Sequence, residues 1–166
     1  MNHGQRLVLA GVMDWLVAER EHVHYAELRP MRTRSLRTLH ALRARLASKA
    51  GVTMDCSESV TLLCKLAGCH DPSGLDFDGA GNTETLLNHL RHYTNPAKAE
   101  VGALVVFDPK VRHGGVLGRH VCMVRRPSAD PILFSHGKES DPRYVRLSAE
   151  RVRDTEPFVL LNVSHL

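Results

Sequence analysis

The chain has 166 residues, of which 43% are hydrophobic and 24% are charged. These proportions are close to the average for soluble globular domains, and the length suits one domain with a sizeable core. The composition excludes a disordered tail, a coiled coil and a fibrous repeat. No apolar run approaches the roughly 18 residues that a transmembrane helix requires. We therefore expect a single domain over residues 1–166, without a membrane span.

The net charge of +4 is unevenly distributed along the chain. The first 50 residues contain nine lysines and arginines against four acidic residues. Such a basic segment favours an anionic partner, namely nucleic acid, an acidic cell wall or a membrane surface, unless it is simply a solvated helix face. Because only 5% of the residues are aromatic, a stacking platform for bases is missing, and we expect no nucleic-acid partner. Residues 1–50 are thus expected to form a basic helical part, and residues 51–166 the core.

Helical patterns dominate the first half of the sequence. Residues 7–18 are mostly apolar, but Asp14 and Trp15 interrupt them and no cleavage site follows, which predicts an amphipathic helix and no signal peptide. Asp55 followed by Glu58 resembles a capping box with Asp55 as the N-cap of a further helix. Spacings of three and four between apolar residues predict helices over 5–20, 35–49, 56–68 and, more briefly, 83–93.

After residue 100 the pattern changes to short β-prone runs separated by glycine, proline and aspartate. The predicted strands span residues 101–107, 119–124, 131–135, 144–147 and 158–163. Helices first and strands later indicate an α+β domain with N-terminal helices packed on an antiparallel sheet.

The four cysteines are too few for a disulfide scaffold. Cys64 and Cys69 precede His70, but the second pair of ligands that a zinc finger or ribbon needs does not appear. We expect no metal and no cofactor. We expect Cys64, Cys69 and Cys122 to be buried as inert, small hydrophobic residues.

Cys56 differs from the other cysteines because it lies at a predicted helix start. There the unpaired N–H groups and the positive end of the helix dipole favour a thiolate. A thiolate nucleophile needs a base, and His120 opens a predicted strand. A third group has to orient that base, and His136 on the following strand is the first candidate, with Ser135 as an alternative.

These segments resemble the NlpC family of cell-wall cysteine peptidases, which have a papain-like fold. Met54-Asp55-Cys56-Ser57 before an apolar helix is similar to the family's nucleophile motif. Residues 101–107, 119–121 and 134–137 are similar to its Gly-Asp-Leu-Val-Phe-Phe strand, its Gly-His-Val strand and the later strand with the third polar residue. Three departures stand out: Glu58-Ser59 replaces the usual Gly-Phe, Ala103 an aspartate, and Arg119 a glycine.

The resemblance implies a role for each matched residue. Cys56 would be the nucleophile, His120 the general base and acid, and His136 the orienting group. Tyr25, the upstream tyrosine, would lie near the oxyanion and substrate site with Asp55 and Ser57; reaching it requires an inserted basic helix between Tyr25 and Cys56. No metal is implied.

The function implied by the resemblance is peptidoglycan hydrolysis, by cleavage of the D-glutamyl–diaminopimelate amide bond in the stem peptide. The alternatives are an amidase or acyltransferase that uses the same triad on another acyl substrate, and an inactive wall-binding or virion-structural module. Residues 71–83 resemble a loop of bacteriophage peptidases. We accordingly expect synthesis in a host cytoplasm, action on the cell wall during lytic release or from the virion, and peptidoglycan and other virion proteins as partners.

Overall fold

The computed structural model describes residues 1–27, 32–48, 51–93, 95–112, 115–138, 140–151 and 156–163. The first helix, α1, spans His3–Ala18 and confirms the predicted helix with a shift of two residues. Asn2 begins it with a capping box: the Asn2 side chain accepts from the N–H of Gln5, and the Gln5 side chain accepts from the N–H of Asn2. Four apolar side chains of α1 are buried in the core: Leu9, Val12, Met13 and Leu16.

Helix α3, Cys56–Leu66, begins where the sequence predicts. The Asp55 side chain accepts a hydrogen bond of 2.8 Å from the N–H of Glu58, as an N-cap residue does. The Glu58 side chain is fully buried, and its carboxylate accepts from the N–H and the hydroxyl of Thr33 at 2.7 and 2.5 Å. The first turn of α3 is therefore tied to the 3₁₀ turn Arg32–Ser35.

Two other predicted helices are shorter in the structure. Helix α2 spans Leu39–Ala47 with Thr38 as its N-cap, since the preceding segment forms the 3₁₀ turn; Lys49, the last residue predicted, lies outside the described residues. Helix α4, Thr83–His89, ends four residues before its predicted end. The predicted end of this helix was wrong because residues 91–93 pair with a neighbouring strand instead.

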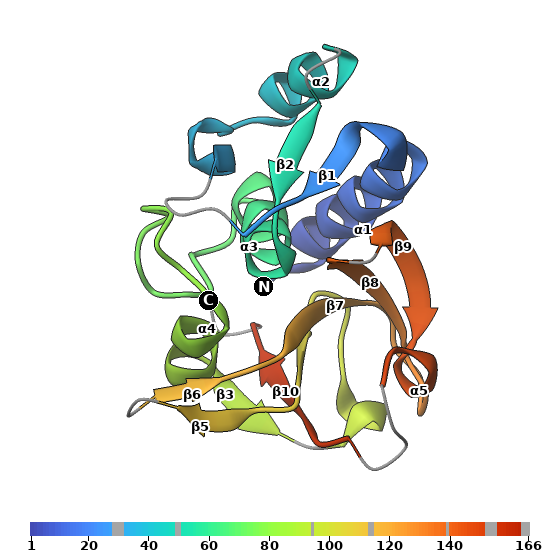
Figure 1. The fold of residues 1–166 in the computed structure, drawn as a ribbon. Coiled ribbons are helices and arrows are strands. Elements are labelled where there is room, and N and C mark those ends of the chain that lie inside the picture. Colours follow the sequence, from blue (N-terminus) through green and yellow to red (C-terminus); the bar gives the residue numbers. More distant parts are fainter. Residues whose placement is uncertain are drawn as a thin grey trace.

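An antiparallel sheet of six strands forms the second half of the domain (Figure 1). Its order is β3-β10-β4-β7-β8-β9. The strands are β3 (Arg91–Tyr93), β10 (Phe158–Asn162), β4 (Leu104–Phe107), β7 (His120–Arg126), β8 (Ile132–Gly137) and β9 (Ser140–Arg146). All five predicted strands are present with shifted ends. The short hairpin β5 (Lys110–Arg112) and β6 (Gly115–Leu117) and the helix α5 (Leu147–Glu150) were not predicted.

Strands β1 (Val23–Tyr25) and β2 (Val52–Met54) form a separate parallel pair that the sequence did not predict. Parallel strands need a crossover connection, and here the connection contains α2. The register places Tyr25 opposite Met54, two residues before Cys56. The inserted basic helix is thus the crossover that allows Tyr25 to reach the start of α3.

The core lies on both faces of the large sheet. Helices α1 and α3 pack side by side against one face, which carries Val121, Met123 and Phe134 (Figure 1). Because side chains alternate along a strand, Cys122 and Leu133 lie on the other face, in a second apolar cluster. The predicted α+β class with helices on an antiparallel sheet is confirmed. Among the described residues, no helix is both long enough and apolar enough to cross a membrane.

Candidate active site

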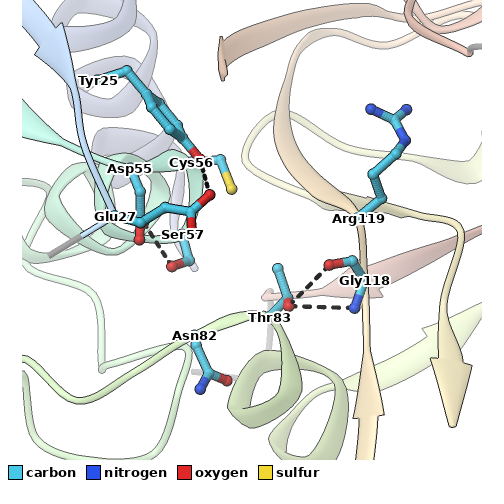
Figure 2. Close-up of a pocket in the computed structure, with 9 residues that line it drawn as sticks. All are labelled: Tyr25, Glu27, Asp55, Cys56, Ser57, Asn82, Thr83, Gly118 and Arg119. Carbon is cyan, nitrogen blue, oxygen red and sulfur yellow. Dashed lines mark hydrogen bonds between the residues drawn. The ribbon is translucent and has the colours of Figure 1, made fainter. Parts of the chain in front are cut away.

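Cys56 is the first residue of α3, and it is 8% exposed. It lines a cleft of about 410 Å³, called here the Cys56 cleft. Figure 2 shows Tyr25, Asp55, Cys56 and Ser57 on one side of this cleft, and Gly118 and Arg119 on the other. The lining residues are Tyr25, Glu27, Asp55, Cys56, Ser57, Asn82, Thr83, Gly118 and Arg119.

Hydrogen bonds around Cys56 fix the first turn of the helix. The Ser57 hydroxyl donates to Asp55 Oδ1 at 2.8 Å, and the Ser59 hydroxyl donates to the Cys56 carbonyl at 2.7 Å. Asp55 and Ser57, predicted near the substrate site, do line the cleft, and in the structure they also hold the helix start together. The N–H groups of a first helical turn have no intrahelical partner and are suited to bind a negative oxygen.

His120 is the first residue of β7, and its imidazole is engaged by two other side chains. Its Nε2 lies 2.9 Å from Ser135 Oγ and 3.3 Å from Glu150 Oε1. The Ser135 hydroxyl donates to Glu150 Oε1 at 2.7 Å, so it accepts from Nε2–H of His120. Glu150, on α5, thereby fixes the tautomer and orientation of the ring, and Nδ1 remains as the nitrogen that can act on a thiol.

The ionisation of His120 follows from these neighbours. Burial by itself would lower the pKa of His120, but the nearby Cys122 and Cys56 side chains and Glu150 outweigh it and hold the pKa well above its ordinary value. Burial would raise the pKa of Glu150, but its hydrogen bonds with His120 and Ser135 lower it overall. The arrangement therefore favours an imidazolium beside an ionised carboxylate.

A second cleft, of about 550 Å³, is lined by His120 and Glu150 and is called here the His120 cleft. It shares Tyr25, Glu27 and Arg119 with the Cys56 cleft, so the two adjoin. Its lining residues are Tyr25, Glu27, Arg119, His120, Gly137, Lys138, Arg143, Ala149, Glu150 and Arg151. The proposed nucleophile and the proposed base thus line two adjoining clefts.

His136 has different contacts from those of an orienting residue. It is 1% exposed, and its Nε2 donates to the Met54 carbonyl at 3.0 Å, an oxygen that also accepts from the N–H of Ala26 at 3.3 Å. Burial lowers the pKa of His136, which favours the neutral ring. The His120 ring thus contacts Ser135 and Glu150 and also lies beside Cys122 and Cys56, whereas His136 joins β8 to the strand that leads into Cys56.

Tyr25, expected from the sequence to lie near a substrate site, lines both clefts. Its hydroxyl donates to Glu27 Oε1 at 3.1 Å, and its ring meets that of His136 edge-on at 5.6 Å between centroids. Burial, together with Cys56 and Glu27 nearby, raises the pKa of the Tyr25 hydroxyl. The hydroxyl accordingly stays protonated and can act as a hydrogen-bond donor.

The wall of the Cys56 cleft opposite Cys56 is fixed by contacts of Gly118 and Arg119, the two residues before His120. The N–H of Gly118 donates to the Thr83 hydroxyl, and that hydroxyl lies equally close, at 3.3 Å, to the Gly118 carbonyl. Arg119 donates from Nε and Nη2 to the buried carboxylate of Glu156, at 2.7 and 3.2 Å. Arg119 thus anchors the start of β7.

Among the described residues, His120, Cys122 and Glu150 form the one group whose potential metal-ligand atoms all lie within 4.8 Å of one another. Imidazole, thiolate and carboxylate are ligands that zinc accepts. Neither a metal nor a part for Cys122 in the site is expected from the sequence.

Glu27 and Glu150 were both missed by the sequence analysis. Glu150 sits in a four-residue helix, and a single glutamate after an Arg-Leu-Ser-Ala run gives no signal that separates it from a solvated surface residue. Glu27 follows Tyr25 by two residues, and in an extended segment this spacing places both side chains on the same face. That spacing is the one sequence signal that could have placed Glu27 beside Tyr25.

No family model, curated protein or solved structure matches the chain. A cysteine at a helix start and a histidine joined to a carboxylate are groups that can carry out thiol-dependent acyl transfer.

Proposed function

We propose that the protein is a papain-like, NlpC-type cysteine hydrolase that cleaves an amide bond in the stem peptide of bacterial peptidoglycan. The observation that carries the proposal is that Cys56, at the start of α3, and His120, joined to Glu150 by Ser135, border adjoining clefts. A thiol, an imidazole and an orienting acid are the components of nucleophilic amide hydrolysis.

In the proposed reaction, the Cys56 thiolate attacks the carbonyl carbon of the scissile amide. The N–H of Cys56 and its neighbours in the first turn of α3 stabilise the resulting oxyanion. The His120 imidazolium then gives its proton to the amide nitrogen, the carbon–nitrogen bond breaks, and the amine leaves a thioester on Cys56. Water attacks the thioester while His120 takes up a proton, which releases the acid and regenerates the thiolate.

The remaining residues are assigned supporting roles. Ser135 and Glu150 hold the imidazole by Nε2, which leaves Nδ1 for proton exchange with the thiol and the leaving amine. His136, originally expected to orient the base, is assigned to position the segment before Cys56 through the Met54 carbonyl. The protonated Tyr25 hydroxyl on the shared wall is a donor for a substrate oxygen.

The choice of substrate rests on the motif resemblance. The bond expected is D-glutamyl–diaminopimelate, and the site of action is the cell wall, at lytic release or from a virion. The proposed reaction uses groups of the chain and water alone.

The test is mass spectrometry of the soluble fragments released from purified diaminopimelate-type peptidoglycan. The wild type should release stem-peptide fragments whose masses identify the bond, and Cys56→Ala should release none. Cys69→Ala is the matched control, because Cys69 is also buried but borders neither cleft, and it should retain activity. Circular dichroism has to show that both variants are folded.

Two results would contradict the proposal. Equal release by wild type and Cys56→Ala would exclude Cys56 as the nucleophile. An absence of release by the folded wild type would exclude the wall substrate, and alkylation with iodoacetamide would then separate the alternatives: selective modification of Cys56 indicates another acyl substrate, and an inert thiol indicates a binding or virion-structural module.

A further inference from the structure

We propose that His120, Cys122 and Glu150 form a Zn²⁺ site, and that Zn²⁺ bound there reversibly inhibits the hydrolase. The metal site is argued from the geometry of these three side chains, whereas the inhibition rests on the proposed function of His120. Because Cys122 has no part in the proposed reaction, the site and the reaction can be tested separately.

The three side chains come together on one face of the large sheet. His120 and Cys122 are two residues apart in β7, and side chains at that spacing lie on the same face of a strand. Cys122 belongs to the apolar cluster on this face, which also contains Leu147 of α5. Glu150 ends the same short helix, and its Oε1 lies 3.3 Å from Nε2 of His120. The site is thus formed by a strand of the sheet and the short helix that packs against it.

The spacing of the potential ligand atoms suits a tetrahedral zinc ion. One nitrogen of His120, Sγ of Cys122 and one oxygen of Glu150 all lie within 4.8 Å of one another. Zinc bonds of about 2.0 Å to nitrogen or oxygen and about 2.3 Å to sulfur place neighbouring ligand atoms about 3.3–3.6 Å apart. The distance of 3.3 Å between His120 and Glu150 already has this value. A small movement of Cys122 relative to this pair completes a site with three protein ligands, and the fourth position is left to water.

The ligand types and their charges favour zinc over the hard cations. A thiolate and an imidazole select zinc and similar transition metals, whereas Mg²⁺ and Ca²⁺ prefer oxygen ligands. The Cys122 thiolate and the Glu150 carboxylate together neutralise both charges of the ion, which suits a place where Cys122 is fully buried and His120 is 6% exposed. The other oxygen of Glu150, Oε2, accepts from Arg143 at 3.2 Å, which orients the carboxylate with Oε1 toward His120.

The His120 cleft gives the ion a path to this site, because His120 and Glu150 line it and its volume is about 550 Å³. On binding, the Cys122 thiol and the His120 imidazolium each give one proton to water, and the metal takes the place of both protons. A zinc-bound imidazole cannot become the imidazolium that protonates the leaving amine in the proposed reaction. The zinc form should therefore be inactive, and removal of the ion should restore activity.

The metal site is tested with Co²⁺, which substitutes for zinc and gives an intense near-ultraviolet absorption band when a thiolate coordinates it. Cys56→Ala is the parent protein, so that the nucleophile cannot supply the thiolate. We expect Co²⁺ to give the band in Cys56→Ala, and Zn²⁺ to abolish it by competition. The band should be lost in Cys56→Ala/Cys122→Ala. It should remain in the matched control Cys56→Ala/Cys69→Ala, because Cys69 is also buried but lies outside the group.

Cys56→Ala/Glu150→Gln is a second test that keeps the buried Cys122 thiol, and it applies even if the Cys122 variant does not fold. Circular dichroism has to show that the variant used is folded. Loss of the carboxylate ligand should raise the dissociation constant for Zn²⁺, measured by calorimetry, at least about tenfold, since groups that only support metal ligands already contribute that much.

Inhibition is tested by the release of fragments from purified peptidoglycan with and without Zn²⁺, and with Mg²⁺ as the control cation. Zn²⁺ should abolish release by the wild type, a chelator should restore it, and Mg²⁺ should have no effect. Each variant is compared with its own metal-free rate. Cys122→Ala should require at least about tenfold more Zn²⁺ for half inhibition, whereas Cys69→Ala should match the wild type.

The outcomes separate the metal site from the proposed function. A thiolate band in Cys56→Ala that is lost with Cys122 would support the site even if the wild type released no fragments. Absence of the band from folded Cys56→Ala, or an equal band without Cys122, would overturn the site. Equal inhibition of the wild type and Cys122→Ala would overturn inhibition through this site, since zinc held by Cys56 and His120 alone would then account for it. Activation by Zn²⁺ would overturn both the inhibition and the proposed thiol reaction.

Discussion

The imidazole of His120 and the carboxylate of Glu150 lie 3.3 Å apart, from Nε2 to Oε1, with both side chains 8% exposed. The Ser135 hydroxyl bridges them from the neighbouring strand. The pKa of His120 is raised, and that of Glu150 is lowered, although burial alone would shift each the other way. The state of the proposed base therefore depends on a residue from α5, a short helix that follows the sheet's edge strand β9.

Replacing Glu150 with glutamine should change the pH dependence of catalysis. The variant loses the negative charge beside His120, so the pKa of the imidazole should fall. The imidazolium needed to protonate the leaving amine would then be lost at lower pH, and the alkaline limb of kcat/KM should move to lower pH. Ser135→Ala is the control, because it retains the carboxylate. An unchanged alkaline limb in Glu150→Gln would exclude this ion pair.

The same pair predicts how stability depends on pH. Folding raises the pKa of His120. Its contribution to the free energy of unfolding is therefore complete below pH 6.5, the ordinary pKa of histidine, and is lost as the pH rises through the raised pKa. Folding lowers the pKa of Glu150. Its contribution to the free energy of unfolding is therefore complete above pH 4.5, the ordinary pKa of glutamate, and is lost as the pH falls through the lowered pKa. The cost of Glu150→Gln, about 1.5–3 kcal/mol for a hydrogen-bonded charge, should be greatest between these values.

Urea titrations of the wild type and Glu150→Gln at pH 4, 5.5 and 8.5 would measure this cost. A maximum at the middle pH is expected. A cost that is constant across the series would mean that the two groups do not ionise as a pair.

Sequence reasoning succeeded where the signal is local. The start of α3 follows from Asp55, whose side chain caps the helix with the N–H three residues ahead, and the strands after residue 100 follow from β-prone runs bounded by turn residues. These features also locate Cys56 and His120, each the first residue of its element.

The parts that sequence reasoning missed depend on contacts between distant segments. The three-residue strands β1 and β2 are stabilised by each other, so neither has a pattern of its own. Residues 91–93 continue a helical pattern, but pairing with β10 overrides it. Either Ser135 or His136 can lie on the same face of the sheet as His120, depending on the register between β7 and β8. A shift of that register by one residue would exchange the two side chains between the faces.

Glu58, at the start of α3, is predicted to stabilise the fold. Its buried carboxylate accepts two hydrogen bonds from Thr33, which link the first turn of α3 to the 3₁₀ turn Arg32–Ser35. Thr33→Val removes the hydroxyl donor but keeps the N–H, and we expect a loss of about 0.5–1.5 kcal/mol for one buried hydrogen bond. Glu58→Gln should couple with Thr33→Val in a double-mutant cycle of unfolding free energies. Additive effects would contradict the link.

His136 is predicted to position the segment before Cys56, and its contribution to stability is predicted to decrease at acidic pH. His136→Phe removes the donor to the Met54 carbonyl, which should cost about 0.5–1.5 kcal/mol and lower kcat. Because burial lowers the pKa of His136, the unfolded chain binds its proton first, and the stability contributed by the neutral ring is lost as pH falls below 6.5. The cost of His136→Phe should thus be larger at pH 8 than at pH 5. A larger cost at pH 5 would mean that the charged ring is the stabilising form.

The close contact of Gly118 with strand β4 is predicted to position Arg119 and His120, the residues that follow it in the chain. A Cβ at residue 118 would lie 2.1 Å from Val106 Cγ1, which is closer than packed atoms allow, and 3.3 Å from the Phe107 carbonyl oxygen, which is a tight contact. Gly118→Ala should therefore cost about 1–3 kcal/mol through overpacking, and it should lower activity by displacing Arg119 and His120.

Val106→Ala supplies the matched rescue, because it removes the methyl group that the new Cβ meets. Alone, it should destabilise the core by leaving a small cavity. Combined with Gly118→Ala, it should restore stability and activity above those of Gly118→Ala, since the added and removed carbons occupy the same space. Thermal unfolding and peptide cleavage by the three variants would measure this. Additive losses in the double variant would show that the contact with the Phe107 carbonyl, and not the one with Val106, keeps residue 118 a glycine.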